Sequence, residues 1–184
     1  MNQFADPVLQ ALVESARAGS GGADAWLAAR RDDHLEIVAA TGPVGATLHG
    51  SIVSVDEGTA GFVVGSGQPM AIALRDDDPR ATSGLASLLG RAPVTVLSVP
   101  CESEDGVIGA LEVVDKADGA MFTFEDVELV TLLAGVAGAA LHAAVEPRVP
   151  PPHEVADALL RLAVDDPARY RTIAGLLGAL LADG

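Results

Sequence analysis

Cysteine is almost absent from this chain of 184 residues, which carries Cys101 alone. A single cysteine cannot close an internal disulfide. The sequence also contains no Cys-x-x-Cys pair and no cysteine–histidine cluster of the kind that holds a structural metal. We therefore expect a reducing compartment, the cytoplasm, and no metal site.

Positive charge is scarce as well. The chain has 11 basic residues against 26 acidic ones, and its net charge is −15. Such a surface repels both the phosphate backbone of nucleic acids and anionic membranes. We therefore expect neither nucleic acids nor lipid surfaces among the direct partners of this protein.

Hydrophobic segments that would target or anchor the protein are missing too. Residues 1–7 contain neither the basic region nor the apolar core of a secretory signal. The longest uncharged run, residues 129–145, includes Gly135, Gly138 and His142 and has 17 residues, fewer than a usual membrane span. We interpret this run as part of a buried helix in a soluble protein.

Apolar residues, in contrast, are abundant: 49% of the chain is hydrophobic, enough for one well-buried core at this length. Asp6 and Pro7 are typical of a helix start, because aspartate caps free amide groups and proline fits the first turn. Apolar residues that alternate around polar turns favour hairpins. The expected elements are a first helix that ends at 19–22, a hairpin of strands 25–30 and 35–40, a short strand at 51–55, a helix at 58–64, a strand at 70–74, a short helix at 81–89, a hairpin of strands 94–99 and 107–114, and a long helix at 122–145.

The long helix at 122–145 is apolar on two sides. A helix can place only one side on its own sheet, so the second side needs another partner. We expect a homodimer through this helix, with close approach at Gly135, Gly138 and Ala139. The alternative is that the C-terminal helices fold back and cover the second side. The two apolar sides consist of Val127, Ala134 and Leu141, and of Leu129, Leu133 and Val136.

The C-terminal part is set apart by residues 146–152, which contain four prolines and are typical of a stiff, extended linker. Two amphipathic helices are expected after it, at 155–164 and from Asp166-Pro167 onward. Helices this small cannot bury their apolar stripes alone, so we expect them to pack on the main domain or on another chain. The predicted organisation is an N-terminal helix at 1–21, a central domain at 22–145, a linker at 146–153 and a helical hairpin at 154–184.

Several motifs in the central part follow one another in a recognisable order. They are EGTAGFVVGSGQP at 57–69, DPR at 78–80, LSVP at 97–100, GVIGALEV at 106–113, DK at 115–116 and FTFED at 122–126. Together, over residues 22–145, they resemble the GAF domain family. The resemblance implies an α+β fold of GAF/PAS-like type, in which helices pack on one face of an antiparallel sheet. The C-terminal helices would be an extension of that fold.

The resemblance also implies a ligand pocket between the sheet and the rim segments at 70–89. The polar residues that we expect to line it are Arg75, Asp76, Thr82, Ser83 and Ser98. Each has a simpler interpretation as well, because Arg75 and Asp76 end a strand where charged residues meet solvent, and Ser98 lies within a strand. GAF domains bind many different ligands, so the resemblance names neither the ligand nor a cofactor, which both stay unknown.

Lys116 and Asp126 lie where cyclic-nucleotide-binding members of the family carry an Asn-Lys-Phe-Asp-Glu signature, whose lysine and aspartate form an ion pair. Here Lys116, Phe122 and Asp126 match the signature. Asp115, however, replaces the asparagine, and Val127 replaces the glutamate. We therefore favour a structural ion pair between Lys116 and Asp126 over cyclic-nucleotide binding.

Catalytic members of the family are a poorer match. Reduction of free methionine sulfoxide needs a resolving thiol, which Cys101 lacks, so we interpret Cys101 as a small apolar residue at a strand end. Haem ligation needs a histidine, and His34, His49, His142 and His153 are the candidates. We do not favour a haem site, because His34 is expected in a turn, His142 near the end of the long helix and His153 after the linker. No Gly-x-Ser-x-Gly or His-Glu-x-x-His motif is present. We therefore expect no enzyme activity.

The function that the sequence favours is a non-catalytic sensory or regulatory GAF domain. A small-molecule or protein signal would alter the pocket, and the helix at 122–145 would transmit the change to a separate effector protein. The alternative is a degenerate GAF domain, whose pocket is filled by its own side chains and which acts as a dimerisation or scaffold module.

Overall fold

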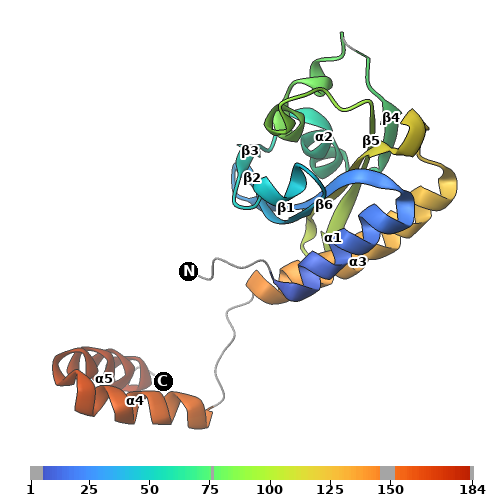
Figure 1. Cartoon of the computed structure of the whole chain (residues 1–184). Helices are drawn as coiled ribbons and strands as arrows, with labels where there is room; N and C mark the ends of the chain where they lie inside the picture. Colours follow the sequence, from blue (N-terminus) through green and yellow to red (C-terminus); the bar gives the residue numbers. More distant parts are fainter. Residues whose placement is uncertain (1–5, 76, 146–151, 183–184) are drawn as a thin grey trace. The chain divides into compact units, whose positions relative to one another are not determined.

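The computed structural model describes residues 6–75, 77–145 and 152–182 (Figure 1). The chain divides into two compact units, one that ends at Val145 and one that follows it. The first unit contains a sheet with its covering helices, and the second contains two helices.

The first unit is built on a six-stranded sheet with antiparallel pairing between neighbours. The strand order is β3-β2-β1-β6-β5-β4, so the two hairpins predicted from the sequence, β1–β2 and β5–β6, meet in the middle of the sheet. Successive side chains along each strand point to opposite faces of the sheet. The apolar ones form two hydrophobic clusters, one on each face. The strands are β1 Gly22–Arg31, β2 His34–Thr41, β3 Ile52–Ser54, β4 Met70–Ala73, β5 Thr95–Ser103 and β6 Gly106–Lys116.

One face of the sheet is covered by α1 (Pro7–Ser20) and α3 (Phe124–Val145), which lie side by side (Figure 1). Asp6 accepts the backbone N–H of Val8 at 2.8 Å, which confirms the predicted helix start. The predicted class, an antiparallel sheet with helices packed on one face, is confirmed by this layer. Its fully buried core includes Val13, Leu27, Leu97, Leu111 and Val130.

The opposite face carries a second layer, which positions the candidate site. It consists of α2 (Gly58–Ser66) and three short 3₁₀ segments, η1 (Gly45–Thr47), η2 (Pro79–Ala81) and η3 (Gly84–Leu89). Apolar residues of α2 and η3 pack against the sheet in this layer and are buried. The core there includes Trp26, Ile37, Val63, Leu85 and Val96.

Two details of this layer differ from the sequence prediction. The single helix predicted at 81–89 is split into η2 and η3, because Gly84 adopts a φ of 57°, in the left-handed region that interrupts a helix. The helix predicted at 58–64 continues to Ser66, because its left-handed cap is Gly67, with a φ of 67°.

α3 is apolar on more than one side, as the sequence predicts, and α1 covers part of its second side. Val130 is fully buried against the sheet, and Leu129 lies against Gly19 of α1. Leu132 and Val136 remain 72% and 52% exposed. α3 is also long and apolar enough to cross a membrane by length and composition, a test that the core helix of a soluble protein passes as well.

Gly138 does not lie on the exposed side of α3, which corrects the sequence prediction. A Cβ atom at this position would lie 2.1 Å from the carbonyl oxygen of Glu102 in β5, whereas a Cβ atom at Gly135 would meet nothing within 4 Å. Gly138 therefore brings α3 close to its own sheet. Gly135 and Ala139 are exposed.

The second unit consists of α4 (Pro152–Asp165) and α5 (Pro167–Ala182), as the sequence predicts. Residues 146–151 of the predicted linker lie outside the described residues, as do the side chains of Leu177 and Leu180. Asp166 joins the two helices and caps α5, because its Oδ1 accepts the N–H of Arg169 at 3.0 Å.

Candidate functional site

A row of polar side chains crosses the α2 face of the sheet at one level of the register. Trp26 of β1 pairs with Glu112 of β6, and Glu112 pairs with Ser98 of β5. Each of the three is at most 1% exposed. The Trp26 indole Nε1–H donates to Glu112 Oε2 at 2.8 Å. Because a glutamate is almost never buried this deeply without a specific reason, the row is a candidate functional site.

α2 lies over this row and holds it through Thr59, whose hydroxyl donates to Glu112 Oε1 at 2.5 Å. Burial raises the pKa of Glu112, and the hydrogen bonds from Thr59 and Trp26 and the nearby Ser98 hydroxyl lower it by less. Among the described residues, Ser98 Oγ has no partner with full hydrogen-bond geometry. Glu112 therefore keeps its proton to a higher pH than an exposed glutamate does.

An open groove of about 600 Å³ lies along the other side of α2. Arg80 forms part of its wall, and its guanidinium is held by Asp78, with 2.6 Å between Arg80 Nη2 and Asp78 Oδ2. This hydrogen bonding lowers the pKa of Asp78 to about 2. α2 thus separates the groove from the buried Glu112. The groove is lined by Asp56, Glu57, Gly58, Phe62, Arg80 and Ser83, among others.

The structure distributes the predicted ligand residues over different places. Ser83 lines the groove beside α2, and Ser98 belongs to the buried row. The side chain of Arg75 is 84% exposed, and Thr82 lies in a separate depression near η3. Asp76 lies outside the described residues. The four described residues therefore do not converge on one pocket.

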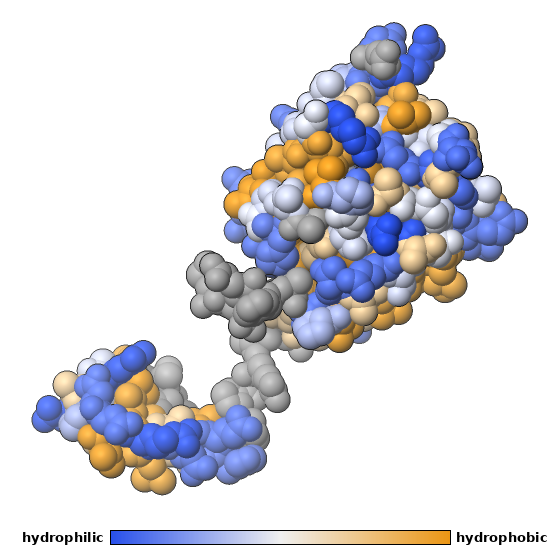
Figure 2. All heavy atoms as spheres, viewed as in Figure 1, coloured by the Kyte–Doolittle hydropathy of each residue, from blue (hydrophilic) through white to orange (hydrophobic). Residues whose placement is uncertain are grey.

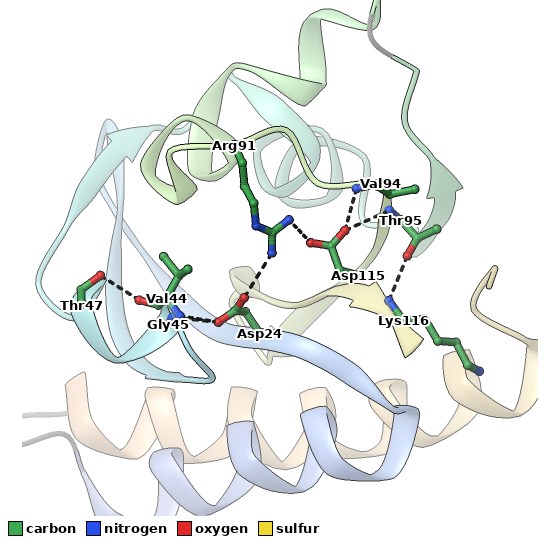
Figure 3. A network of polar contacts seen from close by, with 9 residues as sticks. All are labelled: Asp24, Val44, Gly45, Thr47, Arg91, Val94, Thr95, Asp115 and Lys116. Carbon is green, nitrogen blue, oxygen red and sulfur yellow. Dashed lines mark hydrogen bonds and ion pairs between the residues drawn. The ribbon is translucent and has the colours of Figure 1, made fainter. Parts of the chain in front are cut away.

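A second polar network, which the sequence did not single out, ties the ends of three strands together (Figure 3). Asp24 of β1 is 1% exposed, and its Oδ1 accepts the N–H groups of Val44 at 2.8 Å and Gly45 at 3.0 Å. Arg91 reaches between two carboxylates, since its Nη2 lies 3.5 Å from Asp24 Oδ2 and its Nη1 contacts Asp115 Oδ2.

Asp115 has a structural role of its own in this network. Its Oδ1 accepts the N–H of Val94 at 2.6 Å, and its backbone has a φ of 54°, a left-handed conformation that aspartate and asparagine tolerate better than most residues. The residue that departs from the cyclic-nucleotide signature thus fixes the end of β6 to the start of β5.

Lys116 and Asp126 form the predicted ion pair, which joins the end of β6 to the first turn of α3. Asp126 Oδ2 also accepts the N–H of Thr123 at 2.6 Å, and Thr123 Oγ1 accepts the N–H of Asp126 at 3.4 Å, a reciprocal helix cap. Burial would raise the pKa of Asp126, but the hydrogen bonds from Lys116 and Thr123 lower it overall. The predicted structural brace is confirmed.

Cys101 is fully buried in β5, and burial raises the pKa of its thiol to about 12. Such a thiol stays protonated at neutral pH and is a poor nucleophile, which agrees with its interpretation as an apolar strand residue.

The ring nitrogen Nδ1 of His34 lies 3.0 Å from an Asp33 carboxylate oxygen. In the described parts of the chain, no three His, Cys, Asp or Glu side chains gather as a metal site requires.

The first unit thus combines an antiparallel sheet, helical layers on its two faces and an ion pair that joins the last hairpin to α3. A profile of the GAF domain family matches residues 2–141, so the chain belongs to the GAF domain family. The match includes α1, which the sequence motifs do not reach. GAF domains are sensory and regulatory ligand-binding modules, and in general they are not catalytic.

Two solved GAF domains have the same fold. The GAF-B domain of DevS from Mycobacterium smegmatis is 23% identical, with a TM-score of 0.60 over 77% of this chain and 95% of that one. The GAF domain of a phosphoenolpyruvate-protein phosphotransferase (ptsP) from Coxiella burnetii is 18% identical, with a TM-score of 0.64 over 74% and 81%. These similarities establish the fold alone.

One curated relative is similar in sequence over part of its length. The probable 3',5'-cyclic phosphodiesterase pde-5 of Caenorhabditis elegans is 32% identical over 88 residues, which make up 48% of this chain and 12% of that protein. The chain therefore spans a small part of that relative, and the similarity transfers no activity.

Proposed function

We propose that this protein is a non-catalytic regulatory GAF domain, in which a small-molecule or protein signal binds in the groove beside α2. One observation carries the proposal: α2 has the groove on one side and the buried carboxyl group on the other. Gly58 and Phe62 line the groove, while Thr59 holds Glu112. A ligand that displaces α2 would act directly on the Thr59–Glu112 hydrogen bond.

Strand β6 connects Glu112 to α3. Glu112 and Lys116 lie on β6, and Lys116 pairs with Asp126 in the first turn of α3. A ligand shifts such a path only if it binds one of two arrangements better than the other. In this proposal, the two arrangements differ in the position of α2 and in the strength of the joint between β6 and α3.

In this proposal, the exposed side of α3 contacts other proteins and transmits the ligand-dependent change to them. Leu132 and Val136 form an uncovered apolar stripe, which pairs with its copy in a homodimer. A separate effector protein then reads the dimer. The buried single cysteine and the net charge of −15 support a cytoplasmic protein that binds neither membranes nor nucleic acids directly.

Native mass spectrometry of protein purified from its own cells tests this function. We expect a co-purifying small molecule or protein, and Phe62→Ala should lose it because Phe62 lines the groove and is 52% exposed. Ile52→Ala is the matched control, since Ile52 is 60% exposed and does not line the groove. A chain that carries no partner, or variants that retain it equally, would contradict the groove.

Thr59→Val separates binding from transmission. The variant keeps the shape of the side chain but loses the hydrogen bond to Glu112, so the ligand should still bind while α3 no longer responds. Hydrogen exchange of α3 with and without the co-purified molecule measures that response. An unchanged response in Thr59→Val would contradict the path through Glu112.

A second candidate function, a dimerisation or scaffold module without a ligand, has its own supporting observation. Trp26, Val63 and Glu112 fill the space between α2 and the sheet, and each is at most 1% exposed. This function predicts a stable dimer that carries no small molecule in the same mass spectra, and a partner protein that binds in the absence of any ligand.

A further inference from the structure

The second unit, α4 and α5, has no interior of its own. None of its described side chains is buried, and Val155 of α4 is 38% exposed. Figure 2 shows hydrophobic side chains at the surface of this unit. Helices of 14 and 16 residues are marginal in water without tertiary packing. The unit therefore requires a further surface that covers its apolar side chains.

A groove of about 700 Å³ between α4 and α5 offers such a surface. Val155, Leu159 and Leu162 recur at helical spacing along α4, and Ile173 of α5 lies on the same groove. Ala158 lies within this apolar seam, and its small side chain lets a second helix approach closely. The groove thus suits another amphipathic helix.

The charges that flank the groove change sign along it. Glu154 lies at the start of α4, whereas Arg161 and Arg169 lie toward the turn that joins the helices. Glu154 and Arg161 are two helical turns apart, so they share one side of α4 about 10 Å apart along its axis. An antiparallel second copy, related by a two-fold axis near Ala158, would bring Glu154 of each copy opposite Arg161 of the other. A parallel copy would bring like charges together.

The net charge of this unit also permits self-association. Residues 152–182 carry four acidic and three basic residues, although the whole chain has a net charge of −15. Two copies of α4 and α5 therefore meet without the strong repulsion that two copies of the whole acidic surface would experience.

We propose that α4 and α5 form a self-association module, in which two copies pair antiparallel through this groove as a four-helix bundle. The apolar seam supplies the stabilisation, and the Glu154–Arg161 pairs set the orientation of the copies. The bundle is two-fold symmetric, with the Ala158 side chains of the two copies next to each other across the axis. The module does not depend on ligand binding in the first unit.

Cysteine cross-linking of the full chain tests the position of the axis. Ala158→Cys should form disulfide-linked dimers in oxidised glutathione at least about tenfold faster than Ala156→Cys, because position 156 lies about 200° around the helix from position 158. Cys101 is fully buried, with its thiol pKa raised to about 12, and stays out of the reaction. Equal cross-linking rates of Ala158→Cys and Ala156→Cys would overturn the proposal. The absence of a linked dimer of Ala158→Cys would overturn it as well, and this is the outcome if the helices pack within their own chain.

Charge exchange tests the orientation. In the Ala158→Cys background, Glu154→Arg and Arg161→Glu should each slow cross-linking about tenfold, because each places like charges opposite each other twice in the dimer. The double variant should restore the rate, and the two single variants should link to one another when mixed. Rates that do not respond to these charges, or a double variant that is slower than both single ones, would overturn the antiparallel pairing.

Discussion

Replacement of Glu112 by glutamine isolates the energetic effect of burying its carboxyl group. The side chain is 1% exposed, and burial raises its pKa above 4.5, the ordinary value that we assign to the unfolded chain. Between these two values, the native protein holds one more proton than the unfolded one. The free energy of unfolding should therefore fall as pH rises through this window, by about 1.4 kcal/mol per pH unit.

Glutamine removes this proton exchange and keeps the shape of the side chain. Its carbonyl oxygen can accept the Trp26 N–H, and its amide N–H groups can donate to Thr59 Oγ1 or Ser98 Oγ. The contribution of Glu112 is fully present below pH 4.5 and is lost as pH rises through its raised pKa. Glu112→Gln should therefore gain stability over the wild type by about 1.4 kcal/mol per pH unit within the window, and the gain should level off above it.

Urea unfolding followed by circular dichroism, from pH 5 to pH 9, measures the effect. Glu128→Gln, which removes one carboxylate that is exposed on α3, is the matched control for the change in charge. Contributions from other titrating groups cancel in the difference between wild type and variant. A difference between Glu112→Gln and wild type that stays constant over the whole range would refute the reasoning.

Three other predictions concern α3. Gly138→Ala should lower the free energy of unfolding by about 1–3 kcal/mol, because the added Cβ would clash with the backbone of β5. Gly135→Ala places its Cβ in open space and should be neutral or stabilising by up to about 1 kcal/mol. Urea unfolding compares the two variants, and equal effects would contradict this packing. Thr123→Ala should cost about 1 kcal/mol in the same assay through loss of the helix cap, and an unchanged value would contradict its role. Leu132→Glu should raise the dissociation constant of the dimer at least about tenfold, because Leu132 is 72% exposed on the proposed interface. Light scattering of a dilution series measures this constant. An unchanged constant, or a wild type that is monomeric at micromolar concentrations, would contradict the dimer.

Most of the fold could be predicted because its signals are local. The helix start at Asp6 and the alternating strands each depend on residue types at short spacing, whereas the Lys116–Asp126 pair was predicted from the resemblance to the GAF family. The sides of α3 could be predicted from its period, but not which side meets the sheet. Gly138 therefore looked like a residue for a second helix, although it contacts β5.

The polar row was missed because it joins residues far apart in the sequence. Trp26 and Glu112 are separated by 86 positions and meet only because β1 and β6 are neighbours in the sheet. A signal was available, since Glu112 stands alone as a charged residue inside an apolar strand, where an ionisable group needs a specific partner. Arg75, Asp76, Thr82 and Ser83, in contrast, came from short rim segments whose directions depend on tertiary packing.

Lys116 is the only lysine in the sequence. Its amine is paired with Asp126, and its side chain is 19% exposed. Acetylation, ubiquitination or chemical labelling of lysine therefore has one target in this protein. Because acylation removes the positive charge, acetylation or ubiquitination of Lys116 would remove the ion pair between β6 and α3. A single modified amine would therefore weaken the connection between the last strand and the helix that follows it.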